Sequence, residues 1–113
     1  MRLYTSTLAY DADDRLDVSR YGGHAIGVAF APSLELLWWI KRRRATRDLL
    51  AEYMDRYRAE MRTSQRERPE AWASVLACDE VTCCCYCVNA SACHRAALAE
   101  MLVAMGAEYR GER

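Results

Sequence analysis

The sequence has almost no lysine, no net charge and no uninterrupted apolar run of membrane-spanning length. Lys41 is the only lysine among the 113 residues, and 16 basic side chains balance 16 acidic ones. A chain without excess positive charge is not expected to bind nucleic acid through a generally basic surface. The longest apolar stretch, residues 25–40, is interrupted by Pro32 and Glu35 and is too short to span a bilayer. We therefore expect no membrane span.

The sequence also lacks the marks of a secreted protein. Residues 1–10 have no charged region followed by an apolar region, so no signal peptide is expected. Four of the six cysteines crowd one predicted strand: Cys83, Cys84, Cys85 and Cys87. Because neighbours on a strand point to opposite faces, these thiols are poorly placed to join distant loops. Reduced thiols in a cytoplasm are the expected state.

The order of patterns along the chain predicts one small α/β domain over residues 1–113. Strands are expected at residues 3–8 and 81–87, with a glycine-bearing loop at residues 19–27. About four helices are expected, and their first residues or caps are Ser33, Thr46, Pro69 and Ser91. Gly106 should end the last helix. This order favours a few-stranded, parallel sheet packed with helices, with a Rossmann-like three-layer tendency.

Residues 81–105 hold the strongest chemical signal. There a cysteine-rich strand runs through a polar loop into a helix, and Cys93, His94 and Arg95 lie in a row at the start of that helix. Free backbone N–H groups at a helix N-terminus favour anions and lower the pKa of a thiol. We predict Cys93 as a thiolate nucleophile, His94 as acid and base, and Arg95 as the charge-stabilising group.

The same turn predicts a ligand pocket at the carboxyl ends of the strands. Arg20, in the glycine-bearing loop, and Arg95 are predicted to clamp one phosphate group. Tyr4, Thr5, Cys87 and Ser91 complete the predicted ligand-binding residues. The expected partner is a nucleotide or a nucleic-acid phosphate.

Two other chemistries stay open for the cysteines. Zinc has plausible ligands in Cys85, Cys87, Cys93 and His94, and a redox disulfide has its thiols in Cys87 and Cys93. Against zinc, a C-x-C pair on an extended strand is splayed by about 6.5 Å between Cα atoms. Adjacent residues on a helix also diverge by about 100°. We therefore expect no metal and no cofactor, with the strand cysteines packing as small apolar side chains.

These residues resemble a known family. Cys85-Tyr86-Cys87, five residues of loop and CHRAALAEML (residues 93–102), continuing into GAEYRGE (residues 106–112), look like the C-terminal signature of the domain of unknown function 488 family. Those are small bacterial, archaeal and phage proteins. Three N-terminal segments also resemble the family, namely residues 4–6, 16–20 and 30–33. The segment Cys85-Tyr86-Cys87 departs from the commoner C-A-E.

The resemblance implies a compact α/β domain. Its pocket would lie between the turn at Cys93, His94 and Arg95, which we call the CHR turn, and the N-terminal loop that holds Arg20. It supplies no reaction, so the enzyme question stays open. We expect a cytoplasmic domain that binds a nucleotide or a nucleic-acid phosphate. One alternative is a phage-encoded sensor or sponge for a signalling nucleotide. Another is a non-catalytic interaction protein, including a homo-oligomer, that uses Trp38, Trp39 and residues 41–44.

Overall fold

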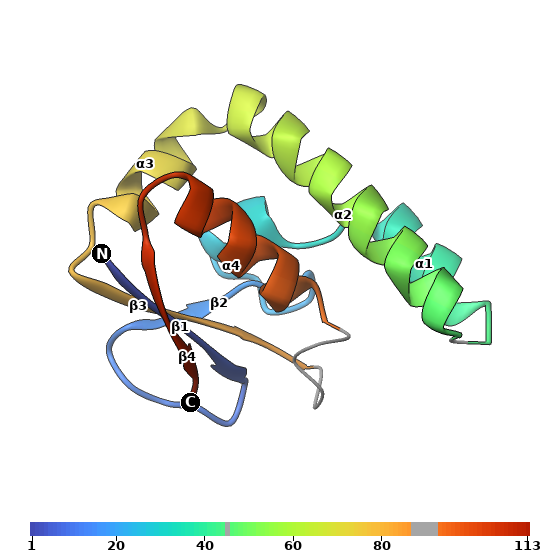
Figure 1. Ribbon diagram of the computed structural model, residues 1–113, viewed down its shortest axis with the longest axis horizontal. Helices are drawn as coiled ribbons and strands as arrows, with labels where there is room; N and C mark the ends of the chain where they lie inside the picture. Colours follow the sequence, from blue (N-terminus) through green and yellow to red (C-terminus); the bar gives the residue numbers. More distant parts are fainter. Residues whose placement is uncertain (45, 87–92) are drawn as a thin grey trace.

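The chain is shown as a computed structural model in Figure 1, and residues 1–44, 46–86 and 93–113 are described. The strands are β1 (Arg2–Thr7), β2 (Arg15–Asp17), β3 (Glu80–Cys85) and β4 (Glu108–Glu112). The helices are the short 3-10 helix η1 (Gly27–Phe30) and the α-helices α1 (Leu34–Lys41), α2 (Arg47–Glu67), α3 (Pro69–Leu76) and α4 (His94–Ala104). No helix in these ranges is long and apolar enough to cross a membrane.

The strands form one sheet in the order β2-β3-β1-β4, and each neighbouring pair is parallel. The predicted small α/β domain with a parallel sheet is therefore confirmed. Strands β2 and β4 were not predicted. The first is only three residues long, and the second is mostly exposed, so neither carries an apolar alternation that the sequence would reveal.

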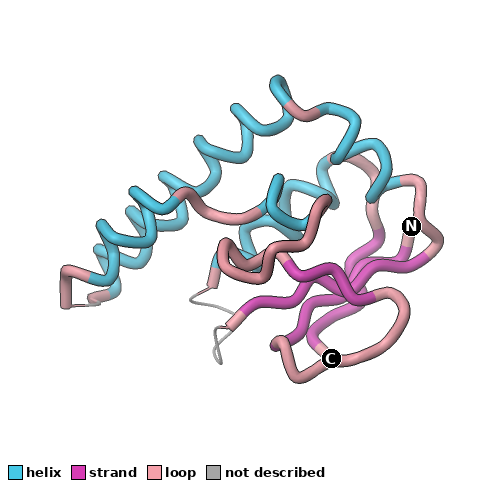
Figure 2. The backbone as a smooth tube through the Cα atoms, turned by 180° about the vertical axis from the view of Figure 1, so that it is seen from behind, coloured by secondary structure: helices cyan, strands magenta, loops and turns pink. Residues whose placement is uncertain are grey.

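The α-helices lie on one side of this sheet (Figures 1 and 2). Two connections contain helices, the one from β2 to β3 and the one from β3 to β4. In the sheet order β2-β3-β1-β4, both lead toward the β4 edge of the sheet. Right-handed crossovers that step in the same direction use the same face. The connection from β1 to β2 steps the opposite way and is a loop, residues 8–14. The helices thus form one layer, in place of the expected three-layer tendency.

The face of the sheet beneath the helices is the core. Leu3, Cys83 and Cys85 point from β1 and β3 into this core, where Trp72 and Leu98 of the helices pack. Burial of Cys83 is complete, as expected of a cysteine acting as a small apolar residue. Burial also raises the pKa of the Cys83 and Cys84 thiols, in the case of Cys84 to about 11, so both stay protonated at neutral pH.

Most predicted helix boundaries are confirmed. The side chains of Ser33 and Thr46 accept hydrogen bonds from the backbone N–H groups of α1 and α2. Pro69 opens α3. The last helix differs, because its N-cap is Cys93 and its first residue is His94. The predicted cap, Ser91, lies outside the described residues.

The second face of the sheet carries a polar network centred on Asp14. Thr82 of β3 and Tyr10 of the 8–14 loop donate hydrogen bonds to the Asp14 carboxylate, and Arg113 Nη1 lies 3.0 Å from Asp14 Oδ2. Partial burial alone would raise the pKa of Asp14. The hydrogen bonds from Thr82 and Tyr10 outweigh it and hold this pKa below its usual value. The ionised carboxylate therefore ties the loop and the C-terminal residue to β3.

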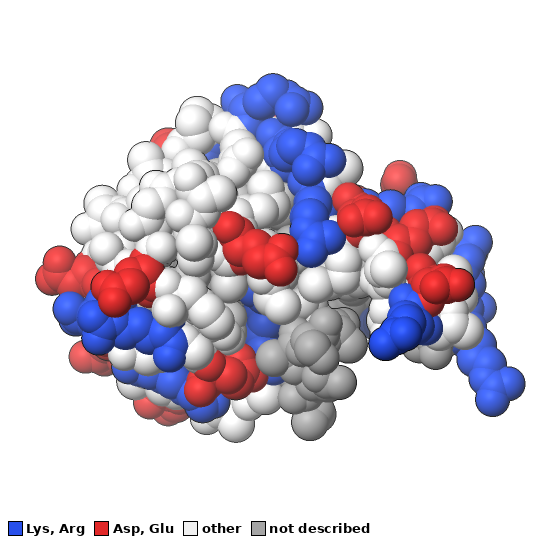
Figure 3. All heavy atoms as spheres, in the orientation of Figure 1, with Lys and Arg blue, Asp and Glu red and all other residues white. Residues whose placement is uncertain are grey.

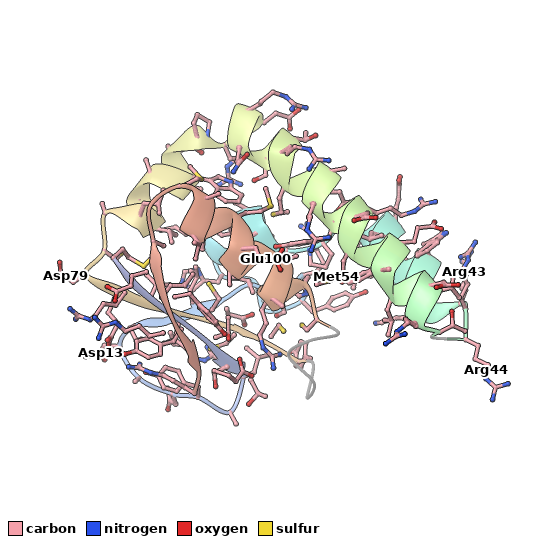
Figure 4. All side chains as sticks on the ribbon, viewed as in Figure 1. Asp13, Arg43, Arg44, Met54, Asp79 and Glu100 are labelled. Atoms are coloured by element: carbon pink, nitrogen blue, oxygen red, sulfur yellow. The ribbon has the colours of Figure 1, made fainter. Side chains whose placement is uncertain are left out.

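The Asp14 network predicts an acid-dependent loss of stability. A lowered carboxyl pKa stabilises the fold above the unfolded-state pKa of about 4, and this contribution is lost as the pH falls further. Asp14→Asn should lower the free energy of unfolding by about 1–2 kcal/mol at neutral pH and by less near pH 3. Urea unfolding at both pH values measures this. Asp13→Asn, an exposed neighbour (Figure 4), is the control and should change little. Equal effects of the two variants would contradict the role given to Asp14.

Candidate functional site

The predicted site residues of α4 lie where β2 and β3 end. Cys85 is the last residue of β3, and residues 18–20 follow β2 directly. His94 opens α4, which Figure 1 shows crossing above this edge of the sheet. Carboxyl ends of parallel strands are the usual place for ligands in α/β folds. The predicted residues therefore lie at the edge of the sheet where the sequence placed them.

Three buried side chains converge there: Cys85, Cys93 and His94, which we call the Cys–His cluster. One donor atom from each lies within 4.8 Å of the others, and Cys93 Sγ is 3.7 Å from His94 Nδ1. The prediction that Cys93 and His94 diverge was wrong. It assumed that both are helical, whereas Cys93 has extended backbone angles, φ −117° and ψ 148°. An extended cap residue can point its side chain toward that of the first helical residue.

The His94 ring is held in one orientation. Its Nε2 lies 3.1 Å from the carbonyl oxygen of Val18, and its ring packs on Tyr57 with centroids 5.1 Å apart. Because a carbonyl only accepts hydrogen bonds, Nε2 carries the proton and Nδ1 presents a lone pair to the cluster. Burial lowers the pKa of His94, and the nearby Arg95 charge acts in the same direction. The imidazole is therefore neutral near pH 7.

Arg95 is fully buried and is committed to structure. Its Nη2 donates to Glu112 Oε2 at 2.6 Å, and its Nη1 donates to Cys85 Sγ at 3.0 Å. The guanidinium thus joins α4 to β4 and to the end of β3. No pattern in the sequence indicated this pairing, because β4 was not predicted. Because a buried charge needs its partner, loss of the Arg95 side chain or of Glu112 should destabilise the fold.

The expected clamp of Arg20 and Arg95 does not form among the described side chains. Arg20 donates from Nε to the carbonyl oxygen of Pro32 at 2.9 Å and from Nη2 to that of Ala31 at 3.3 Å. It lines a pocket that Arg95 does not reach. The two guanidinium groups therefore serve different elements, one the loop before α1 and the other β4.

We call this pocket, which has a volume of about 170 Å³, the Arg20 pocket. Its lining includes Ser19, Arg20, Tyr21, Lys41, Cys85, Tyr86 and His94. Two cations and two largely exposed tyrosine rings face it, and none of its described lining residues is acidic. Tyr21 and Tyr86 were not predicted. Lys41 was predicted only within the 41–44 surface of an interaction protein, and not in a ligand pocket.

Other predicted residues lie elsewhere. Thr5 Oγ1 is 2.8 Å from the Tyr109 hydroxyl, and the Tyr4 ring lies 3.5 Å from the Arg113 guanidinium carbon. Both belong to the contacts of β1 with the C-terminal segment, and neither lines the Arg20 pocket. Cys87 and Ser91 lie outside the described residues.

The tryptophans of α1, with Arg43 beyond its end and Arg56 of α2, form a separate surface. Trp38 is 53% exposed, and the guanidinium carbons of Arg43 and Arg56 lie 4.6 Å and 4.4 Å from the Trp39 ring centroid. Arg43 and Arg44 project from the end of the helix (Figure 4). Basic and acidic side chains alternate over this region in Figure 3, so it is not one basic face. These cations largely stack on rings of the same molecule.

A comparison with protein-family models places the chain in a family. The model described as the active DUF488-N3 subclade matches residues 27–106, more than two thirds of the chain. The match includes α1 to α4 and the whole Cys–His cluster. No curated protein and no solved structure matches the chain.

The Arg95–Glu112 pair predicts a stability difference between two glutamates of β4. Glu112→Gln leaves the buried guanidinium without its carboxylate and should cost about 1–3 kcal/mol. Glu108→Gln removes only an exposed pair with Arg110 and should cost less than about 0.5 kcal/mol. Urea unfolding of the two variants compares them directly. Equal costs would show that Arg95 does not depend on Glu112.

Proposed function

The chain belongs to the DUF488-N3a family, and on this premise we propose that it binds a nucleotide, or a phosphate group of a nucleic acid, in the Arg20 pocket. The observation that carries the proposal is the pairing of two cations with two aromatic rings around a pocket with no described carboxylate. A phosphate needs the cations, and a base or sugar needs the rings.

The position of the pocket supports this function. Ser19 and Arg20 follow β2, while Cys85 ends β3 and Tyr86 follows it, so the pocket lies beyond the carboxyl ends of two adjacent parallel strands. The Asp17 carboxylate accepts hydrogen bonds from the backbone N–H and the hydroxyl of Ser19, which shapes the start of the loop. A ligand therefore meets a loop that is held in place before binding.

The two cations differ in how firmly they are held. Two carbonyl oxygens fix Arg20, and its Nη1 takes part in neither bond. Lys41, at the end of α1, is exposed, and its Nζ lies 5.5 Å from the Tyr21 ring centroid. We infer that Arg20 orients an anionic group and that Lys41 closes over it. The small volume favours a single nucleotide over a polymer.

The neighbouring depressions fit an anion less well. One that shares Arg20 is also lined by Glu60 and Glu67, whose carboxylates repel phosphate. Another lies against Asp13, Asp14 and Glu80. Charge therefore selects the Arg20 pocket among them.

The thiolate mechanism proposed for Cys93, His94 and Arg95 stays a prediction. His94 lines the Arg20 pocket, but Cys93 does not and has no exposed surface. A bound ligand would meet the imidazole before the thiol. Binding without turnover, as in a sensor or a nucleotide sponge, needs only the pocket.

A charge-neutralising pair of variants tests the proposal. Lys41→Gln should weaken nucleotide binding about tenfold, since one charge-assisted contact is lost, and should leave stability unchanged. The probes are a panel of nucleoside mono-, di- and triphosphates with the matching nucleosides, titrated by calorimetry. Arg44→Gln is the control, because this exposed cation points away from the pocket (Figure 4).

The function is supported if the protein binds nucleotides more tightly than nucleosides, and if this difference in affinity is lost in Lys41→Gln but kept in Arg44→Gln. Equal losses in both variants would point to general charge attraction. No binding of any nucleotide would exclude the proposal.

A further inference from the structure

The side chains of the Cys–His cluster make polar contacts that a cysteine packed in an apolar core does not make. Cys83 lies on the same face of β3 and packs among apolar side chains. Cys85, two residues later, receives the guanidinium of Arg95 and faces Cys93 and His94. The cluster draws its donors from two elements, the end of β3 and the start of α4.

We propose that Cys85, Cys93 and His94 bind one zinc ion, in a site that adjoins the Arg20 pocket. Thiolate sulfur with imidazole nitrogen is a donor set that selects zinc over the oxygen-preferring cations magnesium and calcium. Two thiolates also balance the charge of the ion, so that the buried site is neutral. This inference does not depend on the proposed nucleotide function.

The distances agree with tetrahedral coordination. Zn–S and Zn–N bonds of about 2.3 Å and 2.0 Å separate a sulfur from a nitrogen by about 3.5 Å, and two sulfurs by about 3.8 Å. The Cys93 Sγ to His94 Nδ1 distance is 3.7 Å, and the three donor atoms lie within 4.8 Å of one another. Side-chain shifts of less than about 1 Å complete the geometry.

The surroundings of the donors match those of metal ligands. A histidine that binds zinc through one nitrogen usually donates its other N–H to a carbonyl or carboxylate, as His94 Nε2 does to Val18. Arg95 Nη1 donates to Cys85 Sγ at 3.0 Å, a contact that stabilises a thiolate better than a thiol. Two of the three ligands therefore have an orienting partner among the described residues.

The three ligands found among the described residues leave one position of a four-coordinate ion, and Cys87, the fourth ligand considered from the sequence, lies outside those residues. Cys85 and His94 line the Arg20 pocket, and Cys93 does not. We infer that the remaining position faces this pocket, where water or a phosphate oxygen can occupy it. Catalytic zinc sites have this form, with three protein ligands and one exchangeable position.

Cobalt spectroscopy on the full chain tests the site. Reduced, chelator-stripped protein is titrated with cobalt(II), and zinc affinity is then measured by competition. We expect one ion per chain, intense tetrahedral d–d bands and a thiolate-to-cobalt charge-transfer band. Cys93→Ser and His94→Asn should each weaken zinc binding at least about a hundredfold, because loss of even an outer partner costs 10- to 100-fold.

Cys84→Ser is the matched control, since this thiol lies on the other face of β3 with its Sγ 3.5 Å from the Thr82 carbonyl oxygen. It should retain the cobalt spectrum. Lys41→Gln should retain it as well, which separates failure of the nucleotide proposal from failure of this one.

A wild-type protein without the charge-transfer band would overturn the zinc site, even where the variants fail to fold. Zinc binding that survives both Cys93→Ser and His94→Asn would also overturn it. Inorganic phosphate and a competing thiol should each change the d–d spectrum of the wild-type protein by binding at the open position. An unchanged spectrum would contradict the inference of an open position.

Discussion

The burial of one positive charge organises the C-terminal half of this protein. Arg95 has no exposed surface, so its guanidinium requires acceptors inside the fold. Glu112 supplies a carboxylate and Cys85 a sulfur. These contacts draw β4 against β1, hold the first turn of α4 over the sheet and orient the side chain at the end of β3. The geometry of the cluster follows from that requirement.

The same requirement separates two kinds of chemistry. With Arg95 committed to Glu112, the cations that line the pocket are Arg20 and Lys41. Soft donors gather in the buried cluster, while cations and tyrosine rings line the more open pocket. Cys85 and His94 belong to both, so events at the two places can influence each other through these two residues.

The extent to which sequence could predict this molecule varies by element. Ser33, Thr46 and Pro69 are local signals, because a cap bonds to a backbone group three residues away, and all were predicted correctly. Strands β2 and β4 carry no such signal and are held by pairing with β3 and β1. Glu112 could not be assigned a partner until β4 was known.

The residues themselves determined the class of the fold and the placing of Cys93, His94 and Arg95 at the carboxyl edge of the sheet. Periodicity, caps and chemical type are properties of short segments, and they can be read directly. Tertiary structure alone decided that Arg95 faces Glu112, that Lys41 and Tyr86 share a pocket, and that Cys85 meets His94. Those contacts join residues far apart in the chain, and their geometry depends on the sheet order and on the extended backbone at Cys93.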